Sequence, residues 1–270
     1  PIEDLIKDKK RICIIPDGKI NYIPFGALIN NNGKYFIEEY DIYYAPSLST
    51  LSWLRMFPTS GNSNLLALGN PVFSEKDTNE FNLRDSLTFL PATKTEVNLL
   101  KEIYESNAKI LLGLEASETN FIGNAENYGI LHLATHAIMN ENSPMYSSIW
   151  LSSSENDDGF LEAREIIKME LNSRLVILSA CNTAYSHILE GEGMLGLTRA
   201  FFTAGVPSVV ASLWNVEDVA TSKLMVEFHK RIKKGETPIK SLRDAKLHMI
   251  KKQEYKNPFY WAPFILMGKS

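Results

Sequence analysis

Three short and almost continuously apolar runs constrain the fold of this chain more than any other feature of its sequence. They are Ile130–Thr135, Leu175–Ala180 and Ser208–Leu213. Runs of this kind are typical of central parallel strands that are buried on both faces. Because they alternate with amphipathic segments along the chain, they predict an α/β architecture.

Further strand-like and helix-like segments surround these three runs. The other strand-like runs are Arg11–Ile15, Asp41–Tyr44, Leu65–Leu68 and Lys109–Leu112. Helical spacing of apolar residues occurs in Lys94–Ser106, Ser117–Asn124, Ala163–Met169, Gly193–Thr203, Asp218–Lys234 and Pro238–Lys252. Thr93 to Glu96 matches a capping box at the start of the first helix. The pattern predicts a twisted, mainly parallel sheet of about six strands with helices on both faces.

The length of the chain sets its domain organisation. A chain of 270 residues corresponds to one large domain or two small ones. Residues 58–63 read Pro-Thr-Ser-Gly-Asn-Ser and resemble a linker. We therefore expect a smaller, β-rich N-terminal part over residues 1–60 and a larger core over residues 61–270.

Charge, cysteine content and hydropathy exclude several classes of protein. The formal net charge of −4 gives no electrostatic reason to expect a nucleic-acid partner. The two cysteines, Cys13 and Cys181, exclude a disulfide framework and favour a reducing, cytoplasmic location. The longest apolar stretch, Ala200–Trp214, is about fifteen residues, too short to span a membrane. The polar, acidic start at Pro1 is unlike a signal peptide, and without an initiator Met the chain is expected to be a processed product or a piece of a longer one.

A cysteine and a histidine follow two of the buried runs. Cys181 comes directly after Leu175–Ala180, and His136 directly after Ile130–Thr135. Sites in open α/β sheets form at the carboxyl ends of the strands, so an imidazole there could activate the thiol as a nucleophile. The alternative is that Cys181 is a small buried apolar residue. His132, within its run, is interpreted as a core histidine.

Several other segments near the same edge of the sheet have either a functional or a structural interpretation. Gly191–Gly196 has the spacing of a dinucleotide fingerprint, but about ten residues separate it from the preceding strand, which favours a glycine-rich helix start. Trp214, Glu217 and Asp218 follow Ser208–Leu213, and the two carboxylates either cap the next helix or face a substrate pocket. Residues 157–159, Asp-Asp-Gly, are more typical of a turn than of a cation site. His187 is a reserve base, whereas His229 and His248 have no supporting context.

Ten short segments occur along the chain in a characteristic order: Pro16–Gly18, Tyr22–Leu28, Tyr44–Ser47, Leu68–Pro71, Leu90–Ala92 with Glu96, His132–His136, Leu178–Thr183, Gly191–Phe201, Val210–Trp214 and Pro258–Phe264. Together they resemble the CHAT domain, a caspase-like family in the clan that includes caspases, separases and gingipains. The resemblance covers nearly the whole chain. It implies a three-layer αβα sandwich with a mainly parallel central sheet.

The resemblance also implies an activity and the residues that carry it. It implies a cysteine endopeptidase in which His136 is the base, Cys181 is the nucleophile, and the backbone N–H groups of Ala137 and Cys181 bind the oxyanion. It requires no metal and no organic cofactor. The substrate is expected to be a protein or peptide. If Glu192 or Asp218 faces the pocket for the P1 side chain, a basic P1 residue is favoured; the alternative is that both carboxylates are structural. An apolar P1 residue is equally open, with Trp214 as a wall of the pocket.

Family members are often joined to helical-repeat or sensor modules in bacterial signalling and antiviral defence, so a regulatory module in the same chain or complex is expected. No direct contact with nucleic acid or membrane is expected.

Three residues depart from the family pattern. Ala137 stands where the family usually has glycine, and a Cβ there would be strained if φ were positive. Asn182 and Ala184 replace the usual glutamate and glycine after the nucleophile. These departures leave open a catalytically silent interaction domain with the same fold.

Overall fold

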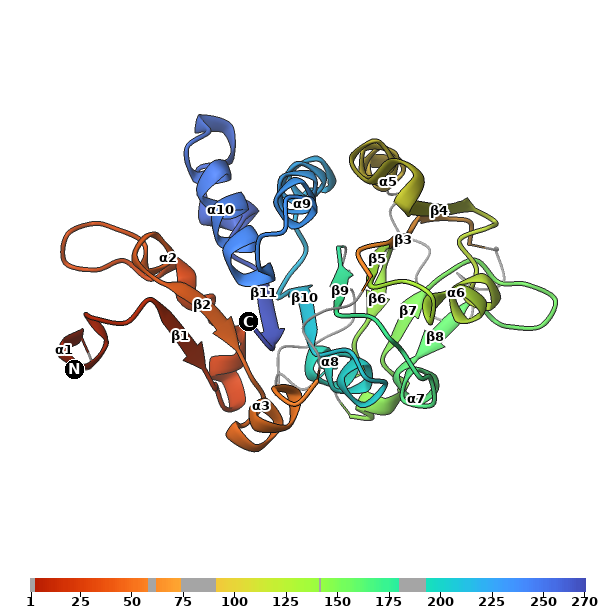
Figure 1. Cartoon of the computed structure of the whole chain (residues 1–270), viewed down its shortest axis with the longest axis horizontal. Coiled ribbons are helices and arrows are strands. Elements are labelled where there is room, and N and C mark those ends of the chain that lie inside the picture. The colour runs from red at the N-terminus through yellow and green to blue at the C-terminus, as the bar shows by residue number, and fades with distance from the viewer. Residues whose placement is uncertain (1–2, 58–61, 74–90, 141, 180–192) are drawn as a thin grey trace.

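All seven predicted strand segments lie in one eight-stranded sheet, in the order β1-β2-β11-β10-β9-β5-β3-β4 (Figure 1). The computed structural model describes residues 3–57, 62–73, 91–140, 142–179 and 193–270. The strands of the sheet are β1 (Arg11–Ile14), β2 (Asp41–Tyr44), β3 (Leu65–Pro71), β4 (Ala108–Gly113), β5 (Ile130–Ala134), β9 (Leu175–Leu178), β10 (Ser208–Ser212) and β11 (Phe264–Gly268).

The strands fall into two blocks of opposite direction. β4, β3, β5, β9 and β10 run parallel to one another, and β1, β2 and β11 form a second parallel block. The two blocks meet at the antiparallel pair β10–β11, in which Val210 is paired with Leu266. The sheet is therefore mainly parallel, as predicted. It has eight strands rather than about six, because the N-terminal strands β1 and β2 belong to it and because β11 was not foreseen.

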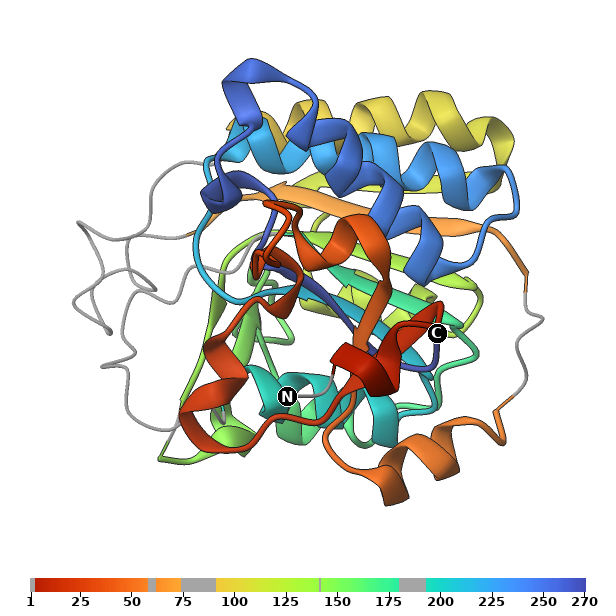
Figure 2. The same cartoon turned by 90° about the vertical axis from the view of Figure 1, so that its left-hand side faces the viewer.

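Helices cover both faces of the sheet (Figures 1 and 2). α5, α9 and α10 lie on one face, and α3 and α8 lie on the other (Figure 2). The α-helices are α1 (Glu3–Ile6), α2 (Phe36–Glu39), α3 (Leu48–Leu54), α5 (Pro91–Tyr104), α6 (Glu118–Ala125), α7 (Ala163–Ile166), α8 (Gly193–Thr203), α9 (Asp218–Lys233) and α10 (Pro238–Ile250). Within the described residues, no helix is long and apolar enough to cross a membrane.

Alternate residues of the central strands point to opposite faces of the sheet. They pack into two hydrophobic cores, one between each face and the helices that cover it. In β5, Leu131 and Leu133 pack with α8, whereas Ile130 packs with α5 and α9. All five residues of this strand are buried. Because both faces of the strand are buried, polar and apolar residues do not alternate along it. Helices on both faces of the sheet give the three-layer arrangement that the sequence predicted.

The start of α5 differs from the prediction. The helix begins at Pro91 rather than near Lys94, so Thr93 lies within its first turn. Proline suits the first helical position because its missing N–H is not needed there. Thr93 Oγ1 accepts a hydrogen bond from Asn70 N at 3.0 Å, and Glu96 is buried. The predicted capping box is therefore wrong.

A small antiparallel sheet continues from the end of β5. It consists of β6 (Ala137–Ile138), β7 (Ser148–Trp150) and β8 (Phe160–Glu162), in the order β6-β7-β8. The chain leaves the main sheet after Ala134 and enters the small sheet at Ala137. The two residues between them, Thr135 and His136, therefore lie where the two sheets meet.

The N-terminal part of the chain extends the main sheet. It contributes β1 and β2 together with α1, α2 and α3. β2 pairs with β11, where Tyr44 faces Met267. The predicted division at residue 60 stays a prediction.

Candidate active site

His136 is held at the junction of the two sheets by its neighbours. Its backbone oxygen accepts a hydrogen bond from Trp150 N at 2.9 Å, and Thr135 Oγ1 donates to Trp150 O at 2.5 Å. The imidazole ring lies 5.9 Å from the ring of Phe73, which follows the carboxyl end of β3. His136 is only 2% exposed. The ring is thus fixed at the carboxyl edge of the parallel block.

The neighbouring strand leads toward Cys181 in the same register. β5 and β9 are adjacent and parallel, with Leu133 paired to Leu178. Ser179 N donates to Leu133 O at 3.0 Å, which extends the ladder by one residue. Three positions beyond Leu133 and Leu178 the sequence reads His136 and Cys181. Cys181, Asn182, Ala184 and Glu192 lie outside the described residues.

Ala137 takes up its position without backbone strain. The described non-glycine residues with positive φ are Asn70 and Glu105, so the Cβ of Ala137 meets no penalty of that kind. The bond from Trp150 N to His136 O makes those two residues a hydrogen-bonded pair, and the next pair, Ala137 with Ile149, is then of the non-bonded kind. Since β6 is an edge strand, the N–H of Ala137 points away from its partner strand.

Trp214 and Asp218 lie beyond the carboxyl end of β10. Trp214 is partly buried, and its indole Nε1 donates to Phe259 O at 3.3 Å. The carboxyl group of Asp218 accepts a hydrogen bond from Ala92 N, in the first turn of α5. Burial and the negative charges of Glu96 and Glu217 raise the pKa of Asp218 to about 6. Asp218 therefore caps α5, not the helix that it begins.

A buried polar cluster next to this edge was not foreseen. Glu96 Oε1 accepts from Ser179 Oγ at 2.5 Å and lies 2.7 Å from His132 Nε2. His132 Nδ1 lies 3.1 Å from His229 Nε2. His132 is thus a satisfied core histidine, as predicted, and His229 belongs to the same cluster. The position of Glu96 beside Val97 on the apolar face of α5 was the signal that could have revealed it.

Other candidates have structural explanations. Asp157 Oδ1 accepts from Ser154 N and Gly159 N at 3.2 and 3.1 Å, as a turn residue does. A Cβ on Gly196 would come within 2.8 Å of Pro144 O, so this glycine allows α8 to pack closely. Cys13 lies on β1, and burial raises the pKa of its thiol. Across the described ranges, no three His, Cys, Asp or Glu residues could hold a metal ion.

A family model for the CHAT domain matches residues 1–269. The chain belongs to the CHAT domain family. Among curated proteins it is 23% identical to human and to mouse tetratricopeptide repeat protein 28, over 96% of this CHAT chain and 12% of each relative. The CHAT chain therefore spans about an eighth of the length of these relatives.

Solved structures of caspase-like peptidases share the fold. The chain aligns with Saccharomyces cerevisiae separase in its complex with securin at a TM-score of 0.61 and 15% identity, covering 96% of this chain and 15% of that one. It aligns with the Arg-specific cysteine proteinase gingipain R at a TM-score of 0.58 and 12% identity, covering 99% and 65%. At these identities the likeness concerns the fold, which is that of the caspase-like clan.

Proposed function

We propose that this CHAT domain is a cysteine endopeptidase in which His136 and Cys181 form the catalytic dyad. The observation that carries the proposal is the register of β5 and β9, in which Leu133 is paired with Leu178. Adjacent strands lie about 4.8 Å apart, and in the sequence His136 and Cys181 each stand three positions after the paired residues. The fixed, buried ring of His136 supports the same reading.

The chemistry follows from these two groups. The Cys181 thiolate attacks the scissile carbonyl carbon, and the backbone N–H groups of Ala137 and Cys181 stabilise the resulting oxyanion. As the tetrahedral intermediate collapses, the C–N bond breaks, His136 gives its proton to the leaving amine, and a thioester remains. Water then gives a proton to His136 and attacks the thioester, which releases the acid and regenerates the dyad. The outward N–H of Ala137 supports its place in the oxyanion hole.

The substrate is a protein or peptide, and three residues are proposed to line its P1 pocket. Glu192 and Asp218 would bind a basic side chain, and Trp214 would contact an apolar one. Asp218 already accepts a hydrogen bond from Ala92. Glu192 is therefore the stronger candidate for binding lysine or arginine.

Regulation by a repeat or sensor module is the second part of the proposal. The curated relatives are named for tetratricopeptide repeats, and this chain matches only a small share of their length. The yeast separase structure contains a second protein, securin. We infer that a helical-repeat or sensor module, in the same polypeptide or in a complex, controls this domain in bacterial signalling or defence in the cytoplasm.

A panel of peptidyl acyloxymethyl ketones with Lys, Arg, Leu, Met or Asp at P1 tests the activity. Mass spectrometry locates the adduct in wild type, Cys181→Ala and His136→Ala. The proposal predicts an adduct on Cys181 that requires His136, strongest with a basic P1 residue. An adduct on Cys13 instead would refute the assignment of the nucleophile.

The alternative is a catalytically silent interaction domain. It rests on Asn182 and Ala184, which replace the usual residues after the nucleophile. The unstrained backbone at Ala137 removes a third argument for it. Folded wild-type protein that reacts with no member of the panel, alone and with its regulatory module, would favour this alternative.

A further inference from the structure

A continuous chain of buried side chains runs between the sheet and the helices α5 and α9. Ser179, which follows β9, donates to Glu96 on α5, and Glu96 contacts His132 on β5. The chain continues to His229 on α9, whose Nδ1 lies 3.0 Å from Tyr104 Oη on α5. Each of these five residues is at most 1% exposed.

Two of these buried side chains, His229 and Tyr104, are uncharged. Burial, reinforced by His132, holds the pKa of His229 well below its usual value, so its ring is neutral. Burial also raises the pKa of Tyr104, which therefore keeps its proton. Tyr104, His229 and His132 are then linked by consecutive hydrogen bonds that lead to Glu96. Glu96 Oε1 is the final acceptor, and it also receives the hydroxyl of Ser179.

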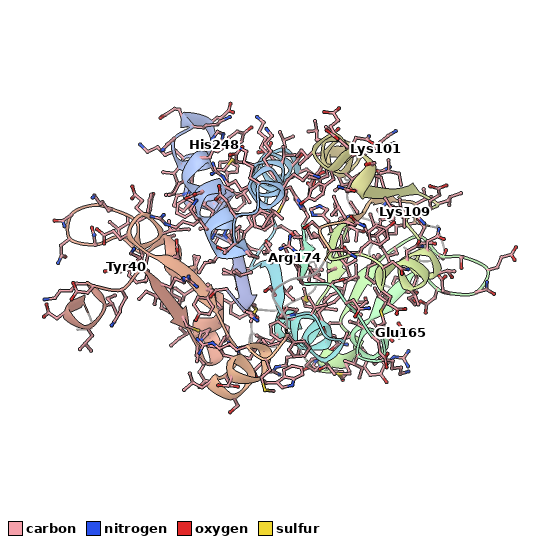
Figure 3. The ribbon with its side chains drawn as sticks, viewed as in Figure 1. Tyr40, Lys101, Lys109, Glu165, Arg174 and His248 are labelled. Atoms are coloured by element: carbon pink, nitrogen blue, oxygen red, sulfur yellow. The ribbon has the colours of Figure 1, made fainter. Side chains whose placement is uncertain are left out.

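Glu96 therefore links the middle of β5 to the carboxyl end of β9, the two strands that lead to the dyad. Its single oxygen binds β5 through His132, four residues before His136, and binds the end of β9 through Ser179, two residues before Cys181. α5 is itself anchored at this edge, since Asp218 caps Ala92. Tyr104, at the other end of this row of hydrogen-bonded side chains, lies about 12 Å from Glu96 along the axis of α5. Lys101 lies on the exposed side of this helix (Figure 3).

We propose that Glu96 is a positioning residue that holds β5 and the carboxyl end of β9 together and so sets the separation of His136 and Cys181. This inference rests on the proposed peptidase function. It assigns Glu96 no contact with substrate. Its effect is on the covalent step and not on peptide binding.

Ser179→Ala is the sharpest test, because it removes only the bond to β9. Its matched control is Ser173→Ala, at the opposite end of the same strand beside Arg174, which Figure 3 labels. Ser173 is 2% exposed, and its Oγ donates to Tyr128 O at 2.6 Å, so both variants delete a buried serine hydroxyl that donates one short bond. The rate kinact and the affinity KI are measured with the most reactive ketone of the panel.

The expected result is a fall of about tenfold in kinact for Ser179→Ala with KI unchanged, since displacements below 1 Å are costly for a reacting pair. Ser173→Ala keeps the wild-type kinact. Glu96→Gln, which retains an acceptor oxygen, stays within about threefold of wild type, whereas Glu96→Leu loses about 100-fold.

Equal kinact values for the two serine variants would overturn the positioning role and leave the peptidase proposal intact. A change in KI rather than kinact would also overturn it. A wild-type protein whose Cys181 is never labelled would refute the peptidase proposal, and the positioning role with it. If Glu96→Leu fails to fold, the two serine variants and Glu96→Gln still decide the question.

Discussion

The carboxyl group of Asp218, the first residue of α9, accepts a hydrogen bond from the backbone N–H of Ala92 in the first turn of α5. N–H groups in a first helical turn have no partner within the helix, and a negative charge there is favourable. Burial nevertheless raises the pKa of Asp218 to about 6, with smaller contributions from Glu96 and Glu217. The contact joins two helices at the edge of the candidate site and makes their association sensitive to pH.

Asp218→Asn is expected to remove a pH-dependent cost from the folded state. The folded pKa of about 6 exceeds the unfolded value of about 3.9, so the native protein binds the extra proton and loses stability as pH rises through this window. Asparagine keeps an acceptor for Ala92 N–H and carries no charge. Allowing for partial exposure, urea unfolding should show the variant about 1 kcal/mol more stable at pH 8 and equal to wild type at pH 4. A difference of the same size at both pH values would contradict this account.

Glu118→Gln is expected to stabilise the fold above neutral pH. Glu118 is 4% exposed, and its Oε2 has no hydrogen-bond partner in the described part of the chain. Burial and the charges of Glu165, Asp157 and Asp158 raise its pKa to about 7. Stability is therefore lost as pH rises from about 4.5 through 7, and the variant should gain about 2 kcal/mol at pH 8 but nothing at pH 4. The exposed neighbour Glu115, changed to Gln, serves as the control and should shift unfolding by less than about 0.5 kcal/mol.

Tyr104→Phe is expected to destabilise the fold by about 1–3 kcal/mol, because it leaves the buried Nδ1 of His229 without its hydrogen-bond partner. Urea unfolding measures the effect at pH 7.5. Tyr40→Phe is a suitable control, since Tyr40 is also buried but its hydroxyl bonds to none of the described residues. Equal losses in the two variants would show that the Tyr104–His229 bond contributes nothing specific.

Ala137→Gly is expected to bring no gain in reactivity, although glycine is usual at this position in the family. The backbone of Ala137 is unstrained, so removal of its Cβ relieves nothing. The added chain entropy should cost about 0.5–1 kcal/mol of stability. The rate of Cys181 labelling should stay within about twofold of wild type. A labelling rate ten or more times that of wild type would show that the Cβ of Ala137 keeps its own backbone N–H in a poor position to bind the oxyanion.

The sequence predicted the strands of the parallel block better than the polar contacts between layers. Ile130–Thr135 and its two companion runs are apolar because both faces of those strands are covered. β11 escaped prediction because Phe264–Gly268 directly follows Pro263, and its continuous apolar residues alone do not distinguish a strand from a buried helix segment. Its antiparallel pairing with β10 depends on tertiary packing.

Glu96 shows why the remaining part could not be predicted. Its spacing from Thr93 fits a capping box, yet Pro91 begins the helix and Asp218 supplies the cap from another element. Glu96 is then free to face His132 and Ser179, from two different strands. Contacts of this kind depend on which helices and strands pack together in the fold, and the local sequence does not determine that packing. The place of His136 after the carboxyl end of β5, in contrast, was predictable from the apolar run that precedes it, whereas its role as a base stays a prediction.

The pH dependence of Cys181 alkylation by iodoacetamide shows directly whether the imidazole of His136 is paired with the thiol of Cys181. The rate is measured from pH 5 to 10 in wild type and His136→Ala, with mass spectrometry separating Cys181 from Cys13. An isolated thiol has a pKa of about 8.5, and a neighbouring imidazolium lowers it. We expect a Cys181 pKa below 7.5 in wild type and a return toward 8.5 in His136→Ala. Identical profiles in the two proteins would contradict the pairing, because the imidazole would then not act on the thiol.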